Sequence, residues 1–230
     1  PFASARSPMR IALLGGTGDL GEGLALRWAF HTNHDVVIGS CDPDDAHAAA
    51  DEYAETVAAH GRDVKITGFE NRMATDRADV VVLAVPPYNV ADTVESVSDR
   101  LGADDVLVTP AAGMQRDEDG FHAHPPSAGS VAALVADAAP DDVPVVGALH
   151  TLPAGRLADL DADLGIDALL VGDDDRAKDV VAGLIEDIDG LRALDAGDLA
   201  NAAEVESLPP LLINLARNND DLADLGISFQ

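Results

Sequence analysis

The glycines that follow the first apolar segment have the types and spacing of a phosphate-binding turn. Gly16, Gly18 and Gly21 fit the pattern G-x-G-x-x-G between the apolar residues 11–14 and the amphipathic residues 20–31. In such a unit the glycines allow a tight turn, close approach of a pyrophosphate and close helix packing. The N–H groups and the dipole at the helix start then favour an anion. The motif predicts a dinucleotide site, with a glycine-rich turn that binds nothing as the plainer alternative.

Alternating apolar and helical segments surround this turn and predict an α/β fold. We expect buried parallel strands joined by right-handed crossover helices, which make a doubly wound, mostly parallel sheet. The expected strands are residues 11–14, 36–38, 64–66, 80–85, 106–109, 143–148, 168–171 and 191–194. The expected helices are residues 20–31, 44–60, 89–101, 130–139, 175–188 and 200–217, the last interrupted by two prolines.

The carboxyl ends of these strands should meet at one edge of the sheet. In open parallel sheets, ligands bind beyond that edge. The segments that follow the central strands are residues 15–18, 39–42, 85–88, 109–113 and 148–154. We therefore expect these five segments to line one cleft.

The net charge of the chain is extreme. There are 42 acidic residues against 14 basic ones, a formal net charge of −28, and the only lysines are Lys65 and Lys178. The acids are spread among apolar segments, which is typical of a folded protein in very high salt, where screening weakens self-repulsion. We predict a halophilic, archaeal protein. The same charge argues against nucleic acid and anionic membranes as partners.

Composition limits the remaining classes of protein. No apolar run approaches the ~18 residues that a membrane span needs. The single cysteine, Cys41, rules out an internal disulfide and fits a reducing cytoplasm. We expect residues 1–8 to be a leader or cloning remnant. The one long loop, residues 115–127, is expected to be a lid, an interface arm or a plain surface loop.

Motifs spread from residue 9 to residue 230 resemble a known family. They comprise residues 9–21, 39–40, 148–154 (Ala-Leu-His-Thr-Leu-Pro-Ala), 171–175, 188–197 and 206–208. The chain is similar to the archaeal deazaflavin-dependent NADP reductases, which use coenzyme F420. The resemblance implies reversible hydride transfer between the reduced 8-hydroxy-5-deazaflavin coenzyme and NADP. It also implies a homodimer, with a Rossmann domain over residues 9–150 and a small C-terminal α/β lobe over residues 151–230 that closes the cleft.

The resemblance further implies which residues contact the two coenzymes. Hydride transfer needs two stacked rings and exclusion of water, so no nucleophile is required. His150 is implied beside the rings as a positioning residue, and no metal is expected. The positions around the pyrophosphate, the nicotinamide ribose, the ring stack and the closing lobe are Gly16, Thr17, Gly18, Asp19, Leu20, Gly21, Val85, Pro86, Pro87, Ala148, Leu152, Ala154, Ser207 and Leu225.

The chain departs from the family at the expected 2′-phosphate pocket. Ser40 is kept, but Cys41 and Asp45 stand where the family carries cations. Asp42 follows Gly21 by about 20 residues, where an acid typically holds the ribose diol of NAD. NADP is the expected coenzyme, and NAD or dual use stays open.

Other cations and two further departures bear on the same site. Of the remaining cations, Arg62 and Arg72 are the candidates to bring positive charge to the 2′-phosphate pocket. Ala203 and Pro209 replace polar family residues near the proposed deazaflavin site.

Two alternative functions remain open. A different nicotinamide-dependent reductase of a small substrate needs a proton donor, commonly Lys or His, and neither lysine falls in the expected cleft. A non-enzymatic redox sensor would keep the glycine turn without needing residues 148–154. Arg156 and Arg192 fit two roles equally well, holding the anionic tail of the deazaflavin coenzyme or neutralising nearby acids.

Overall fold

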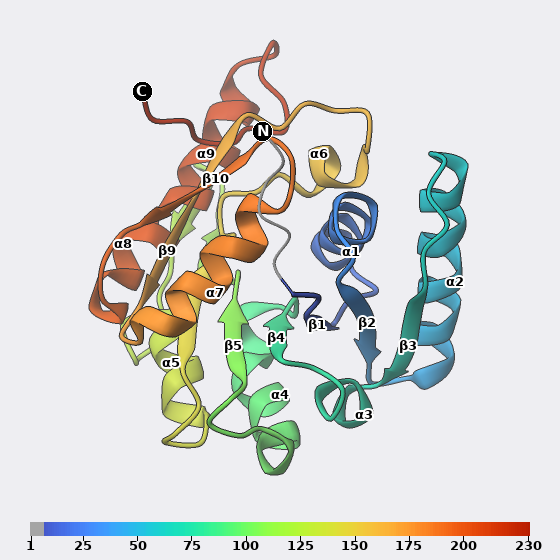
Figure 1. Cartoon of the computed structure of the whole chain (residues 1–230). Helices are drawn as coiled ribbons and strands as arrows, with labels where there is room; N and C mark the ends of the chain where they lie inside the picture. Colours follow the sequence, from blue (N-terminus) through green and yellow to red (C-terminus); the bar gives the residue numbers. More distant parts are fainter. Residues whose placement is uncertain (1–6) are drawn as a thin grey trace.

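The computed structural model describes residues 7–230, so residues 1–6 of the expected leader lie outside the described residues. Figure 1 shows a single large sheet with helices on both faces. The strands are β1 (Arg10–Leu14), β2 (Asp35–Ser40), β3 (Ile66–Glu70), β4 (Val80–Leu83), β5 (Val106–Thr109), β6 (Met114–Arg116), β7 (Phe121–Ala123), β8 (Val145–Ala148), β9 (Ile166–Gly172) and β10 (Leu191–Asp195).

The helices alternate with the strands through most of the chain. The α-helices are α1 (Asp19–His31), α2 (Pro43–Ala59), α3 (Asn71–Thr75), α4 (Val90–Val97), α5 (Val131–Ala138), α6 (Ala154–Ala158), α7 (Asp175–Glu186), α8 (Ala202–Glu206) and α9 (Leu208–Asn218). Short 3-10 helices are η1 (Pro87–Asn89), η2 (Ser98–Arg100) and η3 (Leu199–Asn201).

The large sheet has the order β10-β9-β8-β5-β4-β1-β2-β3. Its six strands from β8 to β3 are parallel and follow the doubly wound order of a dinucleotide-binding fold. Successive side chains of a strand point to opposite faces. Accordingly, Ile11 and Leu13 pack with α1 and α2, whereas Ala12 and Leu14 pack with α3 and α4. The prediction of a Rossmann-like, mostly parallel sheet is confirmed.

The last two strands of this sheet are the ones that are not parallel to the rest, although residues 168–171 and 191–194 were expected among the parallel strands. β9 pairs antiparallel with β8, and β10 runs parallel to β9, so both oppose the other six strands. A parallel pair needs a crossover that returns to the starting edge. The segment between β8 and β9 contains only the five-residue helix α6 and stays at the carboxyl edge, so β9 runs back from there. Residues 151–230 thus extend the same sheet.

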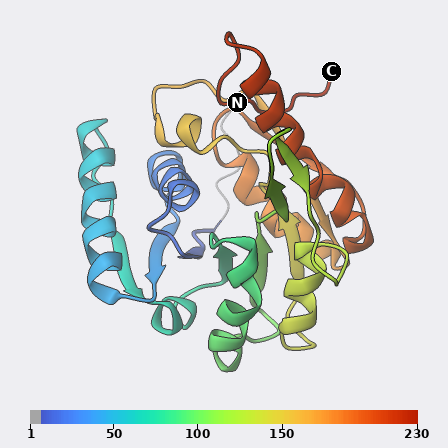
Figure 2. The ribbon, with the colours of Figure 1, turned by 180° about the vertical axis from the view of Figure 1, so that it is seen from behind.

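Two further segments differ from expectation. The third strand covers Ile66–Glu70 rather than residues 64–66, because its inward-facing Gly68 lies directly against α2 and breaks the apolar run. A Cβ on Gly68 would lie 2.2 Å from the carbonyl oxygen of Ala46. The loop 115–127 contains most of the β6–β7 hairpin, which lies beside α9 (Figure 2).

Candidate functional site

The glycine turn has the tight geometry that the motif predicts. The N–H groups of Gly15 and Gly16 both donate to the carbonyl of Gly39, at 3.0 and 3.1 Å, which ties the turn to the end of β2. A Cβ on Gly21 would lie 2.6 Å from Gly16 Cα, so only glycine lets α1 pack this closely under the turn. Tyr53 is buried on α2, and its hydroxyl donates to the carbonyl of Gly16 at 3.1 Å. The turn is therefore held from two sides.

Gly18 differs from the other motif glycines because the fold itself has room for a side chain there. A Cβ on Gly18 would meet nothing nearer than the Gly15 carbonyl, at 3.6 Å. Gly18 is also the N-cap of α1, and its helix start has no side-chain cap within the described chain. The first N–H groups of a helix have no partners in the helix itself. Thr17, Asp19 and Leu20 surround this uncapped helix start, which is open to an anion.

The end of β2 carries acids, and no cation within residues 7–230 pairs with them. Ser40 Oγ accepts from the Asp42 N–H at 3.2 Å, and the Asp42 carboxylate accepts from the Asp44 N–H at 2.9 Å. Asp42 therefore caps α2 with its own negative charge. Cys41 and Asp45 are exposed beside it. Among the described residues, this end of β2 therefore lacks the positive charge that usually binds a 2′-phosphate.

The two arginines that we expected near this pocket are engaged elsewhere. Arg62 donates to the carbonyls of Phe30 and Thr32 at the end of α1. Arg72 pairs with Asp99 at 2.7 Å and donates to the carbonyl of Ser96. Neither guanidinium is directed to the end of β2.

The segment after β4 lies against the glycine turn. A Cβ on Gly15 would be 2.6 Å from Val85 Cγ1, so these two segments touch at the carboxyl edge. Pro86 and Pro87 follow, and Tyr88 projects outward with 80% of its surface exposed. The structure thus brings together the predicted residues 15–18, 39–42 and 85–88.

A second part of the edge is a pocket of about 550 Å³ beside the end of β8. His150 and Leu152 line it, as the sequence predicts, together with Leu225. Ligand pockets in proteins commonly span 300–1,000 Å³ and are mostly apolar. Leu149, just before His150, has a φ of 69°, a conformation that is strained for leucine. The backbone therefore holds His150 in an unusual and specific position.

The imidazole of His150 is the most unusual polar group of this pocket. It is buried, and neither ring nitrogen has a hydrogen-bond partner among the described residues. Burial lowers the pKa of His150 to about 4, so the ring is neutral near pH 7. A neutral imidazole offers one N–H donor and one acceptor. Two unused polar atoms in an apolar pocket fit a ligand that supplies polar partners.

The opposite wall of the pocket comes from α9, the helix of Pro209, which the family resemblance puts near the deazaflavin site. Its lining residues are Pro209, Leu212, Ile213 and Ala216, a helical spacing that forms one apolar stripe. This spacing is visible in the sequence, but nothing local says which surface it faces. Arg217 adds a cation to the pocket and also lies over the ring of Phe121, 5.6 Å from its centroid.

Three predicted site residues lie near the pocket but do not line it. Ala148 is buried in β8, and Ala154 begins α6, where its carbonyl faces Gly23 of α1. Ser207 is exposed between α8 and α9 and donates to the carbonyl of Glu204 at 2.6 Å. Its neighbour Glu206 is buried and accepts from the first N–H groups of α5, at 2.7 and 2.9 Å. Glu206 therefore caps the start of α5 and ties it to the junction between α8 and α9.

Arg27 joins the two halves of the site. This buried side chain of α1 donates to the carbonyls of Arg156, Leu157, Asp159 and Ala162, at or just after the end of α6. α1 starts at the glycine turn, and α6 follows the segment that contains His150. The contact therefore fixes the position of the glycine turn relative to His150. Arg156 itself donates to the carbonyls of Asp163 and Leu164.

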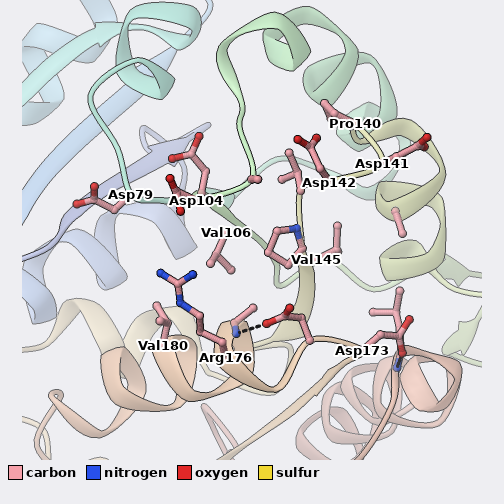
Figure 3. A pocket seen from close by; sticks show the side chains of 18 of the residues that line it. Asp79, Asp104, Val106, Pro140, Asp141, Asp142, Val145, Asp173, Arg176 and Val180 are labelled. Atoms are coloured by element: carbon pink, nitrogen blue, oxygen red, sulfur yellow. Dashed lines mark hydrogen bonds between the residues drawn. The ribbon is translucent and has the colours of Figure 1, made fainter.

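A larger cavity of about 880 Å³ lies at the opposite, amino edge of the sheet. Among the described residues, seven aspartates line it and Arg176 is the only basic residue that does so. Asp104, Asp142 and Arg176 reach it from three separate segments (Figure 3). Nucleotides are anionic, so this acidic cavity is a poor place for them despite its size.

The described residues set two further limits. Within residues 7–230 no group of three or more His, Cys, Asp or Glu side chains is arranged to hold a metal ion. No helix in that range is long and apolar enough to cross a membrane.

Comparison with known proteins gives consistent matches. A family model described as NADP oxidoreductase, coenzyme F420-dependent, matches residues 10–113. The F420-dependent NADP reductase of Methanocaldococcus jannaschii is 37% identical over 209 residues, which cover 90% of this chain and 92% of the relative. The enzyme of the same name from Methanothermobacter marburgensis is 36% identical over 214 residues, covering 92% and 94%.

Solved structures share the fold. A candidate F420-dependent NADP reductase from an Arthrobacter species has a TM-score of 0.77 at 23% identity and covers 96% of this chain and 99% of its own. A pyrroline-5-carboxylate reductase from Coxiella burnetii has a TM-score of 0.61 at 16% identity, covering 92% and 68%. At these identities the likeness concerns the fold alone.

Proposed function

The chain belongs to the F420-dependent NADP reductases, and from this membership we propose how its own residues serve the reaction. It is an oxidoreductase that transfers a hydride between coenzyme F420 and NADP. The deazaflavin and nicotinamide rings supply the hydride chemistry themselves. The protein has to hold the two rings face to face and keep water out.

NADP is assigned to the glycine turn and the adjoining end of β4. The uncapped start of α1 offers free N–H groups to the pyrophosphate, and Gly18 leaves room for it. Val85, Pro86 and Pro87 border the nicotinamide ribose. This placement puts the nicotinamide ring toward residues 148–154.

The deazaflavin ring is assigned to the pocket of His150 and Leu152. The observation that carries this assignment is the pair of buried ring nitrogens of His150, which have no partner among the described residues, beside a pocket with mostly apolar walls. His150 positions the ring by hydrogen bonding, and Leu152 packs against its plane. Arg217 lies at the same pocket and pairs with the anionic tail of the coenzyme.

Discrimination between NADP and NAD is expected to be weak in this chain. The Asp42 carboxylate occupies the start of α2, and both Arg62 and Arg72 are bound elsewhere. A missing bidentate arginine contact costs roughly 1.5–3 kcal/mol of binding. NADP therefore binds with little help at its 2′-phosphate, and NADH should also serve.

The homodimer implied by the family is assigned to the outer side of α9. Leu211 and Leu215 lie one helical turn apart there, with 54% and 41% of their surfaces exposed. Exposed leucines on such an acidic surface favour burial against a second copy. The net charge of −28 and the exposed, unpaired Cys41 favour the salty, reducing cytoplasm that the sequence predicts.

The test is a spectroscopic assay in concentrated KCl that follows loss of the visible absorption of oxidised F420 with NADPH or NADH. Turnover is expected with both nucleotides. Gly18→Ala should raise KM for NADPH, because the added methyl fits the fold but meets the pyrophosphate. Arg217→Gln should raise KM for F420 roughly tenfold. Arg176→Gln, in the acidic cavity, is the control and should change neither.

Absence of turnover with folded protein would overturn the proposed function. Turnover that is insensitive to Gly18→Ala and Arg217→Gln would keep the activity and overturn the residue assignments.

A further inference from the structure

Residues 219–230, here called the tail segment, complete the pocket that the proposed function gives to the deazaflavin ring. After α9 ends, the chain turns back toward β9. Leu222, Ala223, Asp224 and Leu225 all line the pocket, together with His150. One wall of the site is therefore an irregular segment that belongs to no helix or strand.

The tail segment is fastened just beyond these lining residues. The N–H of Asp167, on β9, donates to the Ile227 carbonyl at 2.7 Å, and the Phe229 N–H donates to the Asp167 carboxylate at 2.6 Å. Arg192, on β10, donates to the Phe229 carbonyl at 2.6 Å. Three hydrogen bonds thus hold the tail segment to the edge of the sheet.

Asp167 and Arg192 also hold each other. Two guanidinium nitrogens of Arg192 donate to the two carboxylate oxygens of Asp167, at 2.7 and 2.6 Å. The Asp167 side chain is 5% exposed and that of Arg192 is 54% exposed. A bidentate pair of this kind fixes both position and orientation. We call this pair, with its bonds to Ile227 and Phe229, the latch.

The link between the latch and the pocket wall is short and tight. Gly226 separates Leu225 from Ile227, and a Cβ on Gly226 would lie 2.5 Å from Ile166 Cδ1. On the other side of the wall, Asp224 has a φ of 46°, and its carboxylate lies near Gly155 of α6. Release of the latch would therefore free Leu222–Leu225 from one side.

We propose that Asp167 and Arg192 are positioning residues that hold the tail segment as a wall of the deazaflavin pocket and thereby set the affinity for F420. Neither residue of the pair lines the pocket, and both lie on β9 and β10, the two strands that run opposite to the six strands of the dinucleotide half. Its loss should weaken F420 binding and leave NADP binding and the hydride step nearly unchanged. This inference rests on the assignment of the pocket made above.

The test compares Asp167→Asn, Arg192→Gln and a chain that ends at Gly226. Asp167→Asn keeps the shape of the side chain, and the shortened chain removes Ile227 and Phe229 without altering the sheet. Lys178→Gln is the matched control, because Lys178, on α7, pairs at 3.0 Å with Asp195 at the end of β10, and within residues 7–230 neither side chain bonds to the tail segment. KM and kcat are measured for each coenzyme, and hydrogen exchange is followed in residues 219–230.

All three latch variants should raise KM for F420 roughly tenfold, while KM for NADPH and kcat stay within about twofold. Amide exchange in the tail segment should accelerate in these variants and not in Lys178→Gln. Faster exchange with an unchanged KM for F420 would overturn the proposal. Equal rises in both KM values would assign the pair a general structural role instead. Failure of the wild-type protein to turn over F420 would contradict the proposed function rather than the latch.

Discussion

His150 should make the stability of this protein fall in mild acid, and the size of the effect follows from its burial. The buried imidazole has its pKa lowered to about 4, against 6.5 in an unfolded chain. Protons therefore bind the unfolded chain first. The contribution of His150 to stability is complete above pH 6.5 and is lost as the pH falls toward 4. At about pH 5.5 the folding equilibrium constant should drop roughly tenfold, on the order of 1 kcal/mol.

The assay is urea unfolding in concentrated KCl at about pH 8 and about pH 5.5, for the wild type and His150→Asn. Many carboxylates also begin to titrate in this range, so the informative quantity is the difference between the two proteins in their change with pH. Between these two pH values, the folding equilibrium constant should fall by a factor roughly ten times smaller in His150→Asn than in the wild type. His124→Asn, which alters an exposed histidine, should behave like the wild type. Parallel losses in all three proteins would refute the assignment of His150 as a buried, neutral group.

Two other predictions concern the choice between NADPH and NADH and the contact of Arg27 with α6. Cys41→Arg with Asp42→Arg should raise kcat/KM for NADPH over NADH by roughly tenfold, since it restores a charged contact to the 2′-phosphate. An unchanged ratio in steady-state assays would show that this turn does not recognise that group. Arg27→Met should lower the free energy of unfolding by about 3 kcal/mol, because it leaves buried carbonyls of α6 without donors. Urea unfolding measures this, and a loss below about 1 kcal/mol would contradict the role given to Arg27.

The parts of the site that the sequence predicted are those set by neighbouring residues. The glycine turn needs only its own spacing and the strand and helix beside it, so Gly16, Gly18 and Gly21 were placed from the sequence. His150 and Leu152 were likewise placed by a compact motif, although the strain at Leu149 and the missing partners of His150 appear only in three dimensions.

The parts that were missed depend on distant packing. The reversed direction of β9 follows from a connection that stays at one edge, which an apolar run does not reveal. Arg62 and Arg72, the cations considered for the 2′-phosphate, have partners on other elements, which their positions in the sequence do not reveal. The latch partners are also far apart in the sequence, since Asp167 and Phe229 are 62 residues apart. Such pairings become visible only when the sheet and the tail segment are assembled.

The central claim is that the apolar pocket between His150 and α9 takes the deazaflavin ring while the glycine turn takes NADP. Its most direct test is equilibrium binding of F420 and of NADPH to Ile213→Trp, a variant whose indole fills the pocket from α9. We expect this variant to bind F420 roughly tenfold more weakly or worse than the wild type and to bind NADPH with unchanged affinity. Unchanged F420 affinity in this variant would contradict the claim.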